Sequence, residues 1–346
     1  MVTKIGLDLG YANITISDVT AGIYREPSVA LVDKSTHRVV SVGNNAMSAD
    51  EAGNGNLMLV RPFKNGLLFD QQITYGVIEN AVRAVLPAEK VRCIVGVPAD
   101  FLPKQEKELF SMMSEAGISE SFSVNRAAAA IIGAGYSPTI SLVSVNIGAS
   151  GTDIAVLHGG KIIHSSRSHV GGEDFDKAVK QHILDQGDVN VSLSVARAIK
   201  EKLAAVWQGK EEESIDIEGT LSLTGSRVKM NITTEDIVGV FEKALCDLLS
   251  SVADAIKQIP MDLVEEIFEN GIILTGGGAL VYGIDKLMGK ILGVSVKIPS
   301  DPIDCVAKGL SRINAFMPVR MRSNNKNITS QISKYYETKK TENKRG

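Results

Sequence analysis

The sequence predicts an α/β protein of two related domains with a cleft between them. The chain has 346 residues, which is too many for one ordinary core and enough for two domains of typical size. A pattern of strand, glycine turn and strand near the N-terminus returns in the middle of the chain, and a third glycine turn follows a later apolar strand. The repeat predicts that the second domain begins near Ser141.

Both copies of the pattern are expected to form hairpins with a polar residue at the bend. The first reads KIGLDLGYANITIS and has Asp8 two residues before Gly10. The second reads SLVSVNIGASGTDIAVL and has Asn146 two residues before Gly148. In each, apolar residues run up to the glycine and alternate after it, as in paired strands.

The other elements follow from apolar periodicity and from glycine and proline at the boundaries. The polar, alternating stretch 210–230 predicts an exposed hairpin, and Thr233 with Asp236 is expected to cap a long helix that ends at Ile259. We expect further strands at 28–32, 39–42, 92–97 and 271–275, and further helices at 73–85, 109–117, 127–132, 171–183, 191–207 and 279–292.

The composition is that of a globular protein, with 44% hydrophobic and 22% charged residues. No stretch approaches the roughly 20 apolar residues that span a bilayer, so we expect a cytoplasmic protein. Its three cysteines, Cys93, Cys246 and Cys305, lie among apolar neighbours, which predicts reduced thiols in the core.

The C-terminal segment 318–346 is basic, with eight Lys or Arg residues against Glu337 and Glu342. One interpretation is a solvated, disordered tail. The other is an arm that binds anionic lipid or nucleic acid.

The glycine turns are candidate phosphate sites because a tight turn directs successive backbone amides into one concavity. The alternative is that Gly10 and Gly148 only permit hairpin turns, but the repeat and the third turn at Gly276–Gly278 favour a ligand. Asp8 is a candidate ligand for the waters of a Mg²⁺ ion. The third turn lacks the Lys-Ser or Lys-Thr of a P-loop, and neither hairpin glycine fits a dinucleotide fingerprint.

The three motifs, in this order, resemble those of the actin, Hsp70 and sugar-kinase superfamily. The segments between them are similar to the MreB family of bacterial actins, of which this chain looks like a divergent member. The resemblance rests on IGLDLGYANITI, EPSVA, VGNNA, RPFKNGLL, VGVPA, AAAAIIGAG, HVGGEDFD, GIILTGGGALVYGIDKL and DPIDCVAKG.

The resemblance implies an actin-like, duplicated ribonuclease-H-like fold with two domains, four subdomains and a central nucleotide cleft. Domain I would span 1–140, with a small subdomain at about 33–70, and domain II would span 141–317, with a small subdomain at about 180–235. The implied cofactor is ATP or GTP with Mg²⁺. The implied nucleotide-binding residues are Asp8, Gly10, Tyr11, Ala12, Asn13, Asn146, Gly148, Ala149, Ser150, Gly151, Gly171, Lys200, Gly276, Gly277 and Gly278.

The departures from the family pattern bear on catalysis. Asn146 stands where the family has an acid, and Asn125 and Arg126 stand where it has an acidic pair. Lys202 stands where a glutamate that contacts ribose is usual, and Tyr11 replaces a small hydroxyl residue. We therefore assign no catalytic residue and expect weak or absent hydrolysis, because losing a positioned base lowers rates by about 10² to 10⁴.

The leading functional hypothesis is an MreB-like protein that binds nucleotide and polymerises into cytoskeletal filaments for cell shape or intracellular organisation. Its partners would be further copies of itself, another actin-like protein or a membrane surface, with nucleic acid not expected. The alternatives are a non-polymerising Hsp70-like assembly factor or chaperone, and a kinase of the same superfamily.

Overall fold

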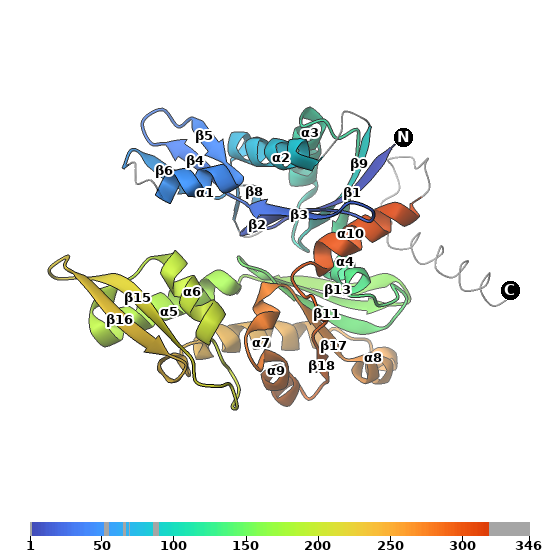
Figure 1. Cartoon of the computed structure of the whole chain (residues 1–346). Coiled ribbons are helices and arrows are strands. Elements are labelled where there is room, and N and C mark those ends of the chain that lie inside the picture. Colours follow the sequence, from blue (N-terminus) through green and yellow to red (C-terminus); the bar gives the residue numbers. More distant parts are fainter. Residues whose placement is uncertain (1, 52–54, 65–66, 69, 86–89, 318–346) are drawn as a thin grey trace, which may run out of the picture.

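The computed structural model describes residues 2–51, 55–64, 67–68, 70–85 and 90–317. The chain forms two lobes, each built around a five-stranded sheet (Figure 1). The basic segment 318–346 lies outside the described residues, so the interpretations of it stay predictions. No helix in the described part of the chain is long and apolar enough to cross a membrane.

The first sheet has the strand order β10-β9-β1-β2-β3. Strand β1 pairs antiparallel with β2, which confirms the first predicted hairpin, and parallel with β9. Helices α2 and α3 bury apolar residues against these strands. The elements are β1 (Thr3–Leu9), β2 (Asn13–Asp18), β3 (Gly22–Pro27), β9 (Val91–Val97), β10 (Glu120–Asn125), α2 (Gln71–Val85) and α3 (Pro103–Glu115).

The second sheet repeats this topology in the order β13-β12-β11-β17-β18. Strand β11 takes the place of β1, because it pairs antiparallel with β12 and parallel with β17. The predicted duplicated fold is therefore confirmed. The elements are β11 (Leu142–Ile147), β12 (Thr152–His158), β13 (Lys161–Ser168), β17 (Ile272–Thr275), β18 (Val296–Lys297), α7 (Glu242–Ile256), α8 (Val264–Asn270) and α9 (Ile284–Leu292).

A small three-stranded sheet extends each lobe on the same side of the molecule (Figure 1). The hairpin of β15 and β16 confirms the exposed hairpin expected at 210–230. The elements are β4 (Ala30–Asp33), β5 (Val39–Val42), β6 (Leu57–Val60), α1 (Gly43–Glu51) and the short pair β7 (Phe63–Lys64) and β8 (Leu67–Leu68) in the first lobe; β14 (Val189–Asn190), β15 (Ser214–Leu221), β16 (Arg227–Thr233), α5 (Gly172–Gly187) and α6 (Leu193–Leu203) belong to the second.

Helices α4 (Arg126–Gly133) and α10 (Cys305–Phe316) lie between the two large sheets (Figure 1). Helix α10 packs on α4 and on β1, β2 and β9, whereas α4 also packs on β11 and β12. The last helix therefore returns to the first sheet. The division of the chain into two domains near residue 140 stays a prediction. Helix α10 lies after this division in the sequence but packs on elements that lie before it.

Three local predictions were wrong. The helix expected at 279–292 begins only at Ile284, because a 3₁₀ turn at Gly277–Leu280 ends before Gly283, which has φ of 77°. The helix expected from Thr233 to Ile259 is broken, because Thr233 and Asp236 close a 3₁₀ turn and Gly239 has φ of 80° before α7 begins at Glu242. Cys246 is exposed, although Cys93 and Cys305 are buried as expected. On α7 the inward face consists of Leu245, Leu248, Leu249, Val252 and Ala255, which leaves the position of Cys246 on the outside.

Candidate functional site

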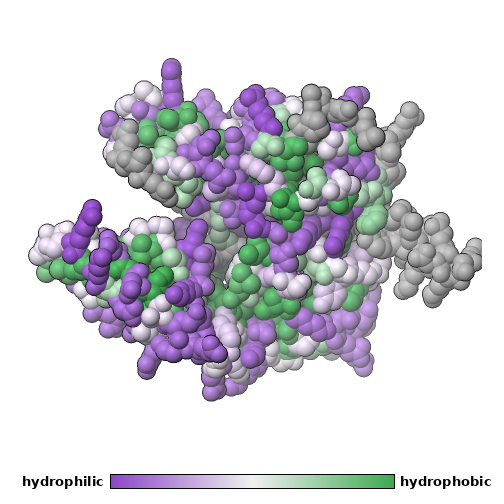
Figure 2. All heavy atoms as spheres, in the orientation of Figure 1, coloured by the Kyte–Doolittle hydropathy of each residue, from purple (hydrophilic) through white to green (hydrophobic). Residues whose placement is uncertain are grey.

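A cavity of about 480 Å³ lies where the two lobes meet, and the space-filling view shows the hollow between them (Figure 2). Its volume falls in the range of roughly 300–1,000 Å³ that is typical of small-molecule sites. Of the expected nucleotide-binding residues, Ser150, Gly151 and Gly171 are not among the lining residues. Those that line it are Asp8, Gly10, Tyr11, Ala12, Asn13, Asn146, Gly148, Ala149, Lys200, Gly276, Gly277 and Gly278.

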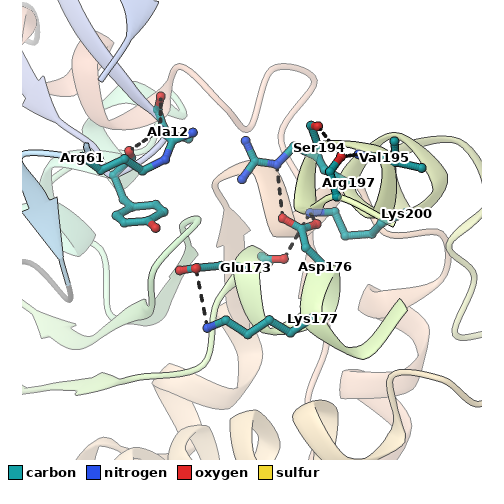
Figure 3. A network of polar contacts seen from close by, with 12 residues as sticks. Ala12, Arg61, Glu173, Asp176, Lys177, Ser194, Val195, Arg197 and Lys200 are labelled. Atoms are coloured by element: carbon teal, nitrogen blue, oxygen red, sulfur yellow. Dashed lines mark hydrogen bonds and ion pairs between the residues drawn. The ribbon is translucent and has the colours of Figure 1, made fainter. Parts of the chain in front are cut away.

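The first glycine turn, between β1 and β2, is held from outside by Arg61. The Arg61 guanidinium donates to the carbonyl oxygens of Tyr11 at 2.9 Å and Ala12 at 3.2 Å (Figure 3). It also lies 5.0 Å from the centre of the Tyr11 ring. Burial raises the pKa of Tyr11, and the charge of Glu173 adds to that shift. The two hydrogen bonds from Arg61 hold the backbone of this turn in place without a ligand.

The second turn, between β11 and β12, is joined to the start of α5. The amide of Gly148 donates to the carbonyl of Gly151 at 2.9 Å, which closes the turn. The amides of Gly172 and Glu173 donate to the carbonyls of Gly148 and Ala149 at 2.9 and 2.8 Å. These bonds fix the second turn to the start of α5 and use the amides of its first residues, so α5 positions the turn.

The third turn packs directly on the second. Gly276 has φ of 83°, and an added Cβ would lie 2.3 Å from the carbonyl oxygen of Ile147, so only glycine fits there. The hydroxyl of Thr275 donates to the Asn146 amide oxygen at 3.2 Å. These contacts join the second and third turns, and residues of all three turns line one cavity.

Helix α6 forms a charged wall of the cavity. Asp176, which is 1% exposed, pairs with Lys200 at 2.6 Å and with Arg197 at 3.2 Å (Figure 3). The wall includes Glu201, whereas Lys202 is exposed and does not line the cavity. Lys202 was expected to replace a glutamate that contacts ribose, but its position lies outside the cavity.

Sequence reasoning missed several lining residues. Arg197, Glu201 and Ala204 share a helix face with Lys200 at spacings of three and four, so periodicity was the signal for them. The others come from scattered segments with no local pattern. They are Thr15, Arg25, Gly172, Phe175, Lys210, Leu280, Val281, Ile303 and Val306.

Beneath the turns, two aspartates face two arginines. Arg126 Nε lies 3.4 Å from Asp8 Oδ1, and Arg126 Nη1 lies 3.9 Å from Asp153 Oδ2. Arg167 donates to Asp153 Oδ1 at 3.0 Å, and both of these side chains are 3% exposed. Burial raises the pKa of Asp8, and Arg126 opposes that shift.

Mg²⁺ keeps several of its waters and is usually held by one or two carboxylates together with the phosphates of its ligand. Asp8 already faces a guanidinium, and position 146 carries an amide whose oxygen accepts from Thr275. In the described part of the chain, no group of three or more His, Cys, Asp or Glu side chains could hold a metal ion. The role expected for Asp8, as a ligand of the waters of a Mg²⁺ ion, stays a prediction.

Asn125, expected only as a replacement for an acid, has a structural role. It is the N-cap of α4, and its side-chain oxygen accepts from the amide of Ala128 at 3.1 Å. Capping satisfies one of the free amides in the first turn of a helix. Asn125 does not line the cavity.

The duplicated sheets, with glycine turns meeting at a cavity between the lobes, define an actin-like protein. The family model of the MreB/Mbl protein matches residues 2–320. The chain belongs to the MreB/Mbl family of bacterial actins, as the sequence predicted.

Several relatives resemble the chain over most of its length. The cell shape-determining protein Mbl of Bacillus cereus is 31% identical over 312 residues, which is 88% of this chain and 93% of the relative. The cell shape-determining protein MreB of Escherichia coli is 28% identical over 316 residues, with 88% and 91% covered.

Solved structures agree in fold. MreB 5 of Spiroplasma citri bound to AMPPNP has a TM-score of 0.85 at 24% identity and covers 91% of this chain and 96% of its own. The MamK double helical filament has a TM-score of 0.79 at 20% identity and covers 92% and 100%. At these identities the likeness establishes the fold alone.

Proposed function

We propose that this chain binds ATP or GTP in the cavity and polymerises into filaments that serve cell shape or intracellular organisation, with weak or absent hydrolysis. The observation that carries the proposal is the meeting of three glycine turns around one cavity. Turns of this kind hold phosphate through backbone amides and need no side-chain charge.

The relatives support both parts of the proposal. MreB 5 of Spiroplasma citri is bound to AMPPNP in one structure and to ADP in another, and MamK forms a double helical filament. The family members Mbl and MreB are cell shape-determining proteins. Further copies of the chain are thus the first partner to test, before another actin-like protein or a membrane surface.

Weak hydrolysis follows from the residues at the three positions where acids were expected. Asn125, Arg126 and Asn146 carry no carboxylate, and Asn125 caps α4. Without a positioned base, phosphate release should be slower by about 10² to 10⁴ than in a relative that has one. The turns need no acid to bind phosphate, so binding survives this loss.

Nucleotide binding can be tested by adding a side chain inside the cavity. Gly277 lines the cavity, and an added Cβ there meets no protein atom within 4 Å, so the backbone at this position accepts a side chain. We expect the purified protein to bind a fluorescent ATP analogue and Gly277→Leu to lose that binding. Gly55→Leu is the matched control, because Gly55 is equally open but lies outside the cavity. Equal binding by all three proteins would place the ligand elsewhere.

Assembly and hydrolysis can be measured together. We expect sedimentation and negative-stain electron microscopy to detect filaments in the presence of ATP, with little phosphate released over the same period. A monomer at every concentration would refute the filament role. Phosphate release as fast as that of active relatives would show that some other acid positions the water.

A further inference from the structure

Helix α6 places two cations in the wall of the cavity, and these cations share one carboxylate. Arg197 and Lys200 both line the cavity. They pair with Asp176 of α5 at 3.2 and 2.6 Å, and Asp176 is 1% exposed (Figure 3). The single negative charge of Asp176 therefore cannot neutralise both cations.

The two cations differ in how many of their donors are already used. Lys200 Nζ lies 2.6 Å from Asp176 Oδ1 and also donates to the carbonyl of Gly172 at 3.2 Å. Arg197 donates to Asp176 through Nε, at 3.2 Å. Among the residues that the structure describes, Arg197 Nη1 and Nη2 have no hydrogen-bond partner. The outer edge of this guanidinium thus keeps its N–H donors for a ligand.

One acid lines the same wall of the cavity. Glu201 is exposed, and it forms no ion pair within the described part of the chain. Because water and salt screen an exposed charge, Glu201 offsets little of the charge of Arg197. The guanidinium therefore presents most of its positive charge to whatever occupies the cavity.

Arg197 lies on the opposite side of the cavity from the first glycine turn. Tyr11 and Ala12 of that turn line the same cavity, and Figure 3 shows Arg197 extending from α6 toward the side of Ala12. Arg61 holds the turn by two hydrogen bonds, and its pKa is lowered by burial and by the charge of Arg197, which acidic side chains of α5 oppose only in part. The two guanidinium groups repel each other, and an anion bound at the turn would reduce that repulsion.

We infer that Arg197 binds the phosphate groups of the ligand through its guanidinium, so that the affinity of the cavity increases with the number of phosphates. This inference rests on the proposed nucleotide binding and names the side chain that recognises the anionic part of the nucleotide. The planar fork of a guanidinium matches the oxygens of a phosphate group. Arg197 adds this contact to those that the backbone amides of the turns supply.

The experiment compares ligands that differ in phosphate number. A fluorescent ATP analogue bound to the full-length protein is displaced by ATP and, separately, by AMP, and the ratio of the two affinities is the readout. We expect the parent protein to prefer ATP, and Arg197→Gln to lower the ATP-to-AMP ratio by about tenfold. Added salt should weaken ATP binding by the parent protein more than by this variant, because one charge contact is missing in the variant.

Lys202→Gln is the matched control, because Lys202 lies on the same helix but outside the cavity. It removes the same charge and should leave the ratio within about threefold of the parent value. Arg197→Lys keeps the charge and loses the fork, so its ratio should lie between those of the parent protein and Arg197→Gln. Asp176 retains Lys200 as its partner in both Arg197 variants, and circular dichroism checks that they are folded.

The outcomes separate this inference from the proposed function. An unchanged ratio in Arg197→Gln overturns the inference and leaves nucleotide binding intact. Equal losses for ATP and AMP overturn it as well, because they mean that Arg197 only supports the wall of the cavity. If Arg197→Gln does not fold, a parent-like ratio in Arg197→Lys overturns the inference. No binding of the analogue by the parent protein overturns both the inference and the proposed function.

Discussion

Asn125 stabilises the N-terminus of helix α4. Its side-chain oxygen accepts from the Ala128 amide at the helix N-terminus. We expect Asn125→Ala to lower the free energy of unfolding by about 1 kcal/mol, because an N-cap substitution by alanine leaves that amide without its acceptor. Urea denaturation monitored by circular dichroism measures the change.

Asn125→Asp provides the control for this prediction. An aspartate accepts the same hydrogen bond and adds a negative charge at the positive end of α4, so stability should be equal to or above that of the parent protein. Equal destabilisation by alanine and by aspartate would mean that the amide group of Asn125 acts through its donor side, contrary to the capping role.

Single residues at the site were predictable where the signal is local. The glycine turns were found because a strand, a glycine and a strand lie within a few residues of each other, and most of the residues assigned to them line the cavity. Arg126 was seen only as a missing acid, because its contacts with Leu9 and Asp153 come from segments far away in the chain. No pattern in the sequence gives the direction of that side chain.

At the scale of elements, the crossing of α4 and α10 depends on two glycines. An added Cβ at Gly309 would lie 1.8 Å from the Ala129 carbonyl oxygen, and one at Gly133 would lie 1.7 Å from that of Cys305. We expect Gly309→Ala to lower the free energy of unfolding by about 1–3 kcal/mol, since the helices must move apart. Chemical denaturation provides the measurement.

The matched control is Gly76→Ala on α2. The nearest atom to an added Cβ there is Val42 Cγ1 at 3.7 Å, which is an ordinary contact. Alanine is the better helix former by about 1 kcal/mol, so this variant should be as stable as the parent protein or more stable. If Gly309→Ala were equally harmless, the close crossing would not be a constraint on the fold.

The prediction of helices and strands succeeded where the apolar periodicity agrees with glycine or proline at the boundaries, as in the hairpins of both large sheets and in β15–β16. It failed at α7, where a capping pair read as a helix start closes a 3₁₀ turn instead. The position of α10 could not be read from the sequence either. Helix α10 packs on β1, although the two elements are separated by almost the whole sequence, and no local pattern encodes such a long-range contact.

At the scale of the whole molecule, the two lobes have separate hydrophobic cores. One core draws on the first sheet with α2 and α3, and the other on the second sheet with α5, α6, α7 and α9. Two smaller clusters join them, and α4 contributes one face to each. The lobes are thus linked mainly through α4 and α10.

This arrangement predicts that a nucleotide makes unfolding more cooperative. Without ligand, the lobes should unfold partly independently, so the calorimetric enthalpy should exceed the van't Hoff enthalpy. A ligand held by turns of both sheets stabilises only the state in which both lobes are folded, so saturating ATP should raise the unfolding temperature and bring the two enthalpies together. Gly309→Ala, which loosens the α4–α10 link, should widen the difference between the enthalpies in the ligand-free protein. Equal enthalpies without nucleotide, in the parent protein and in this variant alike, would show that the lobes already fold as one unit and that the small clusters around α4 couple them fully.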